Sequence, residues 1–129
     1  MKTFVTIAIL YLVVDLLWIY VMSPMLYMKA LSKIQKSTIK FNKMYAILAY
    51  ILLLVTIFKI CIPLSKTYTK RKWLAFTIVG VSIYGIYNLT NAAVFSDYSA
   101  KMIIIDTLWG GVVFSMIGLL HNKIIKSGF

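Results

Sequence analysis

The chain has 129 residues, of which 62% are hydrophobic and only 13% are charged, and its formal net charge is +11. Soluble domains carry about a quarter charged residues, and a fold of this size could not hide so much apolar surface from water, whereas a bilayer can solvate it. The composition therefore excludes an ordinary soluble domain and predicts an integral, multi-pass membrane protein. The cations lie between and beside the apolar runs, which disfavours nucleic-acid binding and predicts contact with membrane lipids through anionic headgroups.

Four apolar runs, at about residues 4–22, 44–64, 73–95 and 102–120, divide the chain. Each is close to the roughly 20 residues that a helix needs to cross the hydrocarbon core. The first run contains Asp15 and lacks a small-residue cleavage site, so we interpret it as an uncleaved helix, ended by Pro24, and not as a signal peptide.

The segments between these runs predict how the helices are connected. Residues 25–43 are rich in lysine and predict either an amphipathic helix in the interface or a solvated loop. The later connections, 65–72 and 96–101, are short, and short connections favour antiparallel neighbours. We therefore predict an all-α fold, with residues 1–129 forming a single transmembrane domain, a four-helix up-down bundle. The two termini of such a bundle lie on one side of the membrane. That side carries seven cations and the other side carries six, so the tendency of cations to remain in the cytoplasm places the termini there.

Three of the four runs carry polar side chains on one helical face, because these residues are three, four or seven positions apart. At about 1.5 Å rise per residue, these groups lie about 7–12 Å below the membrane side away from the termini. Polar groups are costly in hydrocarbon and usually face a protein interior or a water-filled cavity. We predict one intramembrane pocket, lined by Asp15, Trp18, Tyr84, Tyr87, Asn88, Asn91, Asp106 and Trp109.

Asp15 and Asp106 determine what such a pocket could do. No basic residue lies at their depth, so we expect neighbouring amides, indoles and hydroxyls to donate hydrogen bonds to them, or the acids to take up protons. Two acids in close proximity would share a proton. The leading hypothesis is a pocket that binds a small ligand or handles protons.

Two other functions are compatible with the same residues. The polar side chains could serve only to hold helices together, in a structural or assembly protein, and the small residues Gly110, Gly111 and Ser115 are typical of close or oligomeric helix packing. A membrane enzyme using an aspartate as general acid or base is the third hypothesis. It has less support, because the chain lacks hydrolase, nucleotide-binding and metal-site motifs, and the pattern names no cofactor.

Several motifs resemble one uncharacterised family. They are Asp15-x-x-Trp18, the stretch at 84–93 with its Leu-Thr-Asn core, and Asp106-x-x-Trp109-Gly110. The family is domain of unknown function 2177, four-helix membrane proteins of bacteria and large DNA viruses. The resemblance covers essentially the whole chain and implies a location in a cell membrane, or in a host-derived or virion membrane.

The chain departs from this family at two positions. The family commonly has an acid where this chain has Asn88 and a tryptophan where it has Tyr98. The missing acid lowers the charge of the pocket, which favours a binding role over a proton relay. The resemblance implies no established activity.

Overall fold

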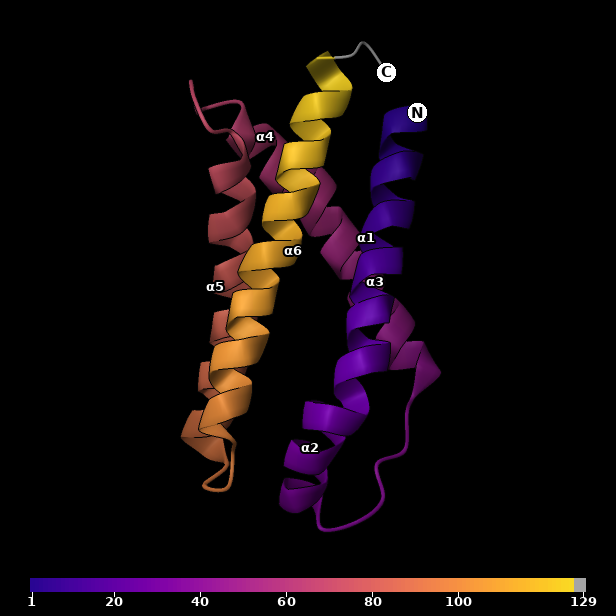
Figure 1. Ribbon diagram of the computed structural model, residues 1–129, viewed down its shortest axis with the longest axis vertical. Coiled ribbons are helices and arrows are strands. Elements are labelled where there is room, and N and C mark those ends of the chain that lie inside the picture. The colour runs from indigo at the N-terminus through magenta and orange to yellow at the C-terminus, as the bar shows by residue number, and fades with distance from the viewer. Residues whose placement is uncertain (127–129) are drawn as a thin grey trace.

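The computed structural model describes residues 1–126, and its regular elements in that range are all helices. Four continuous helical stretches are long and apolar enough to cross a membrane. Figure 1 shows the start of α1 and the last turn of α6 at one end of the bundle, with the α5–α6 turn and α2 at the other. The predicted all-α, multi-pass bundle is confirmed. Its elements are α1 (Lys2–Met22), η1 (Ser23–Tyr27), α2 (Met28–Gln35), α3 (Lys43–Thr56), η2 (Ile57–Cys61), α4 (Ile62–Ser65), α5 (Trp73–Val94) and α6 (Ala100–Lys126).

The prediction that the first helix ends at Pro24 is wrong, because the helix continues to Gln35. Proline has no N–H and its ring collides with the carbonyl four residues earlier, so an ordinary α-turn would be broken there. The chain instead widens into the π-helical turn η1, in which the Met28 N–H bonds to the carbonyl of Ser23, and α2 follows directly. The lysine-rich connector is therefore helical up to Gln35 and irregular from Lys36 to Asn42.

The second apolar run also contains a π-helical turn near its C-terminal end. The π-helical turn η2 immediately precedes Pro63, and the Ile62 N–H bonds to the carbonyl of Ile57. The helix then continues through Pro63 and ends at Ser65. π-Turns and prolines are the usual causes of bends in long helices, so both wide turns change the direction of a span.

Polar side chains cap the ends of two helices at the α2 side of the bundle. The Asn42 side chain accepts hydrogen bonds from the Met44 and Tyr45 N–H groups at the start of α3. The Ser99 Oγ accepts from the Met102 N–H in the first turn of α6, at 3.2 Å. These caps satisfy backbone donors that have no partner inside the helix, and they fix where α3 and α6 begin.

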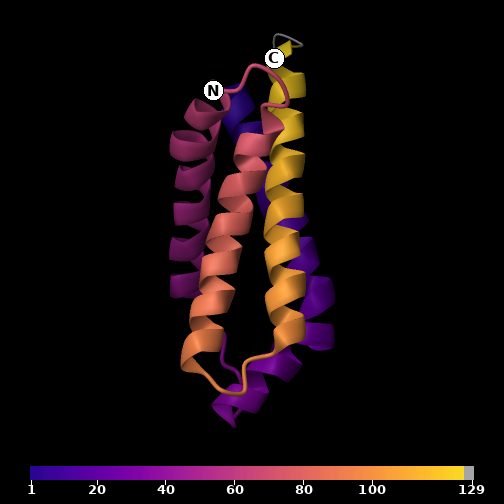
Figure 2. The same ribbon diagram turned by 90° about the vertical axis from the view of Figure 1, so that its left-hand side faces the viewer.

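The helices α5 and α6 form the most extensive contact in the bundle, and Figures 1 and 2 both show them side by side. Small residues let them approach. A β-carbon at Gly80 would overlap the carbonyl oxygen of Gly110 and fall 2.7 Å from Cβ of Phe114, and one at Gly111 would fall 2.8 Å from Val81. The hydroxyls of Thr77 and Ser115 meet across the same interface at 2.5 Å.

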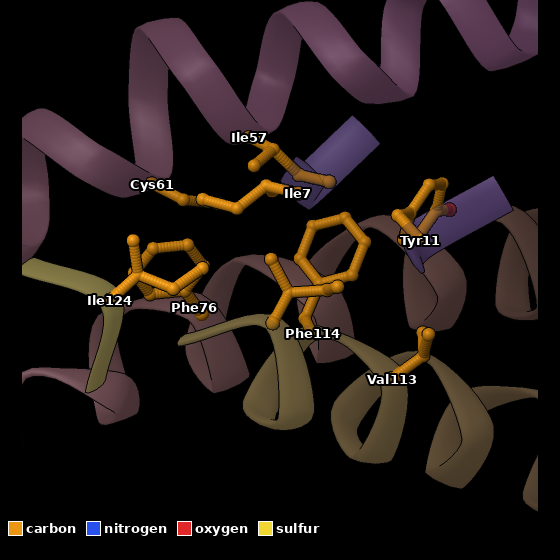
Figure 3. Close-up of a cluster of buried hydrophobic side chains, with 9 residues drawn as sticks. Ile7, Tyr11, Ile57, Cys61, Phe76, Val113, Phe114 and Ile124 are labelled. Carbon is orange, nitrogen blue, oxygen red and sulfur yellow. The ribbon is translucent and has the colours of Figure 1, made fainter. Parts of the chain in front are cut away.

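A cluster of buried apolar side chains joins α1 and η2 to this pair. Figure 3 shows Ile7 of α1 beside Ile57 and Cys61 of η2, while Phe114 of α6 faces this group and Tyr11 of α1 lies near Phe114. All five of these side chains are fully buried. Most other large apolar side chains of the four spans are exposed on the outside of the bundle, as expected where lipid is the solvent.

The small-residue contact between α5 and α6 can be tested by adding one methyl group. Gly80→Ala should lower the free energy of unfolding by about 1–3 kcal/mol, because the new methyl collides with the backbone of Gly110. Gly85→Ala is the matched control, since its β-carbon would meet only Thr107, at an ordinary 3.5 Å, and alanine favours helix over glycine by up to about 1 kcal/mol. Thermal unfolding of the two variants in detergent gives the comparison. Equal midpoints would contradict the described packing.

Candidate functional site

Asp106 lies at the centre of a buried network of hydrogen bonds in the half of the bundle nearer the α5–α6 turn. Its carboxylate is only 7% exposed. The Tyr27 hydroxyl donates to Oδ1 at 2.5 Å, and the Asn88 side-chain amide donates to Oδ2 at 2.6 Å. The carboxylate of α6 thus binds η1 on one side and α5 on the other.

The other hydrogen bonds of Tyr27 and Asn88 determine which atom donates to Asp106. The Trp18 indole N–H is a donor only, and it bonds to the Tyr27 hydroxyl at 2.8 Å, so that hydroxyl must point its own hydrogen at Asp106. The same Nδ2 of Asn88 also donates to the carbonyl of Tyr84 at 2.7 Å, which makes it the amino end of the amide. Both partners therefore direct hydrogens at Asp106, the arrangement suited to an ionised carboxylate.

Asp15 of α1 is the second buried carboxylate, with 4% exposure. The Trp109 indole N–H donates to Oδ1 at 2.9 Å, and the Tyr50 hydroxyl donates to Oδ2 at 2.6 Å. Asp15 therefore connects α1 to α6 and to α3. The two carboxylates do not bond to each other, so the expected shared proton has no direct counterpart in the structure of residues 1–126.

A pair of stacked indoles joins the two carboxylate sites. The rings of Trp18 and Trp109 lie 4.2 Å apart and 3° from parallel. Trp18 donates toward the Asp106 site through Tyr27, while Trp109 donates directly to Asp15. One continuous polar and aromatic unit thus contacts α1, η1, α3, α5 and α6.

Neither buried carboxylate has a cationic partner among the described residues: no lysine, arginine or histidine of residues 1–126 forms a salt bridge with Asp15 or Asp106. That range also contains no group of three or more histidine, cysteine, aspartate or glutamate side chains that could hold a metal ion. Asp106 and Asn88 each lie six residues from the α5–α6 turn, or about 9 Å along their helices. Two acids thus sit within the membrane-spanning part of the bundle, supported by neutral donors.

A family model provides the identification that the motifs suggested. The model described as "Predicted membrane protein (DUF2177)" matches residues 1–121. The chain belongs to this family. No curated protein and no solved structure matches the chain. All the network residues lie inside the range that the DUF2177 model matches.

The structure brings most of the predicted pocket residues of this DUF2177 member together. Asp15, Trp18, Asn88, Asp106 and Trp109 are joined by the hydrogen bonds and the ring stacking described above. Tyr84 takes part through its carbonyl and through its hydroxyl, which lies 3.2 Å from that of Tyr11.

Two predicted pocket residues lie apart from the carboxylates. Tyr87 is 53% exposed on the outside of the bundle, because the fully buried face of α5 passes through Gly85 and Asn88. Asn91 is half-buried and interacts with Tyr98. The predicted stripe on α5 is therefore wider than the face that contacts the acids.

Three tyrosines of the network were missed by the sequence analysis. Tyr27 lies beyond Pro24, where the first helix was expected to have ended. Tyr50 is seven residues into α3, about 10 Å from its start, but it is an isolated polar group in an apolar run, and depth alone does not show which way it faces. Tyr98 lies in the α5–α6 turn.

Tyr98 connects the network to the edge of the bundle. Its hydroxyl donates to Oδ1 of Asn88 at 2.7 Å. Burial raises the pKa of the Tyr98 phenol above its ordinary value of 10.0, so the phenol keeps, at neutral pH, the proton that it donates. Tyr98 thus orients the amide that in turn donates to Asp106.

Two grooves on the described surface are lined by residues other than Asp15 and Asp106. A groove of about 520 Å³ lies between the η1–α2 segment and residues 96–101, with Tyr98 in its lining. An apolar groove of about 390 Å³ runs along the lipid-facing side of α5 and α6. The carboxylates themselves are buried and contact Tyr27, Tyr50, Asn88 and the Trp109 indole.

The indole stack gives a spectroscopic test of the site. Two indoles in contact couple their excited states, so the circular dichroism spectrum should contain an exciton couplet. Trp18→Phe and Trp109→Phe should each abolish it, whereas Trp73→Phe, at the start of α5 and outside the stack, should keep it. A couplet that survives both stack variants would contradict the described site.

Proposed function

We propose that this DUF2177 protein is a proton-responsive membrane protein, in which Asp15 and Asp106 bind and release protons within the membrane. The observation that carries the proposal is the pair of buried carboxylates held by neutral donors, without a cation among the described residues. Intramembrane acids are rare and costly, and they commonly mark sites that handle ions or protons.

The packing around the acids favours a proton over a larger ligand. The described hollows are lined by other residues, and both carboxylate oxygens of each acid already contact a donor of the protein. A small molecule would have to displace these donors. A proton needs no cavity, and binding one requires only that a neighbouring hydroxyl reorient.

Protonation of Asp106 would weaken one contact selectively. The Tyr27 hydroxyl already accepts from Trp18, so if it also accepts from a protonated Asp106, its own hydrogen has no acceptor left in the network. The bond between Tyr27 and Asp106 is the side-chain hydrogen bond that joins η1 to α6. Proton binding at Asp106 would therefore loosen the η1–α2 segment, and proton release would fasten it.

Asn88 suits a binding site better than a relay. Where the family commonly has an acid, this chain has an amide that donates to Asp106, so no continuous row of acids passes protons along α5 and α6. Reversible binding needs only the two aspartates. The proposed function is therefore confined to this site: the charge on a buried acid controls a contact between two helical segments.

Infrared spectroscopy tests the proposal directly, because a protonated carboxyl and a carboxylate absorb at different frequencies. Acidifying the protein in lipid should produce a carboxyl band that loses intensity in Asp106→Asn and in Asp15→Asn, and loses the contribution of both buried acids in the double variant. Asp97→Asn is the control, since Asp97 is exposed in the α5–α6 turn and takes no part in the network around the buried acids.

The structural role makes the opposite prediction in the same experiment. If the polar side chains only hold the helices together, the buried aspartates keep one protonation state for as long as the protein is folded. The Asp106→Asn variant then changes thermal stability without changing the pH-difference spectrum. This outcome would overturn the proposal.

A further inference from the structure

A groove at the α2 end of the bundle combines a cationic rim with an apolar wall. It has a volume of about 520 Å³, within the range of small-molecule sites. Lys29 and Lys33 line it from α2, and Lys101 lines it from the first turn of α6. Asp97 is the one acid in its lining, and none of these lysines forms a salt bridge with it among the described residues.

The cations in this groove outnumber its acids, with three lysines against Asp97. Lys29 and Lys33 are four residues apart on one helix, a spacing at which like charges repel. The N-terminal end of the 27-residue helix α6, which carries a partial positive charge, lies at the same groove through Ser99 and Lys101. An anion in the groove would remove this repulsion and contact both walls at once.

The order of residues along the helix distinguishes a lipid from a free anion. The first helix approaches this side from the membrane interior, so Met25 and Leu26, which also line the groove, lie deeper than Lys29 and Lys33. Lys33 is eight residues beyond Met25, or about 12 Å along the helix axis. The groove therefore changes from apolar to cationic toward the membrane surface, as a phospholipid changes from its chains to its phosphate.

The first helix is also long enough to place this groove at the headgroups. It spans residues 2–35, 34 in all, which is about 50 Å of helix against a hydrocarbon core of about 30 Å. Figure 1 shows α2 and the α5–α6 turn at the same end of the bundle. The helix is therefore long enough for its lysine-bearing end to extend beyond the hydrocarbon core, on the side where the headgroups lie.

We propose that the groove between α2 and the α5–α6 turn binds the phosphate headgroup of one anionic phospholipid, through Lys29, Lys33 and Lys101. The glycerol and the first part of the acyl chains lie against Met25 and Leu26. This site is separate from the buried aspartates, because neither Asp15 nor Asp106 lines the groove.

Native mass spectrometry of the full chain in detergent tests the proposal, with phosphatidic acid, phosphatidylcholine and inorganic phosphate as probes. The unmodified protein should retain phosphatidic acid in preference to phosphatidylcholine. The triple variant Lys29→Gln/Lys33→Gln/Lys101→Gln should lose at least about tenfold of that affinity, because each lysine near an anionic lipid contributes appreciably. The matched control is Lys36→Gln/Lys40→Gln/Lys43→Gln, which removes equal charge from exposed positions on the same side and should change the affinity by less than about threefold.

The remaining outcomes decide against the proposal. Equal losses in both triple variants would indicate a diffuse attraction to net charge. Displacement of the lipid by inorganic phosphate at matched concentration would indicate a site for a free anion. The indole couplet of the groove variant verifies its fold, and Lys101→Gln alone, which leaves α2 intact, should still weaken binding several-fold; unchanged binding in that variant would also contradict the assignment.

Discussion

The hydrogen bonds that Asp106 accepts are the interaction on which the site depends. A carboxylate in a low-dielectric bundle must be surrounded by donors or become neutral. Here Trp18, Tyr27 and Asn88 form a directed set in which each hydrogen has one acceptor, and the set ends at the acid. Because its members come from α1, η1 and α5, these hydrogen bonds connect three segments to one side chain of α6.

Two features of the backbone bring these donors within hydrogen-bonding distance of Asp106. The π-turn at η1 lets the first helix continue past Pro24 and brings Tyr27 back toward the bundle. The glycine contacts of α5 and α6 hold these helices close enough for Asn88 to reach Asp106. Widened helical turns often occur at functional sites. The one at η1 contributes Tyr27 as a hydrogen-bond donor, whereas a break in the helix at Pro24 would have directed this segment elsewhere.

The sequence predicted the fold class well because hydropathy and length alone identify membrane spans. Face and depth also predicted Asp15, Asn88 and Asp106 as neighbours, since polar groups at one depth avoid lipid by meeting each other. The donors from other segments were harder to predict. Tyr27 depends on how the chain accommodates a proline, and Tyr50 stands alone in an apolar run, where an isolated tyrosine is equally compatible with a lipid-facing position. Their roles follow from tertiary packing, which periodicity within one helix does not contain.

Spin-label spectroscopy of α2 tests the central claim most directly, namely that the charge on Asp106 fastens η1 and α2 through Tyr27. The label is attached at Gln35→Cys, an exposed position at the end of α2, after the buried Cys61 is replaced by alanine. We predict that acidification makes the label more mobile, that Tyr27→Phe gives the mobile spectrum at every pH, and that the exposed control Tyr20→Phe keeps the pH response. A label whose mobility is independent of pH, or that responds normally in Tyr27→Phe, would contradict the account.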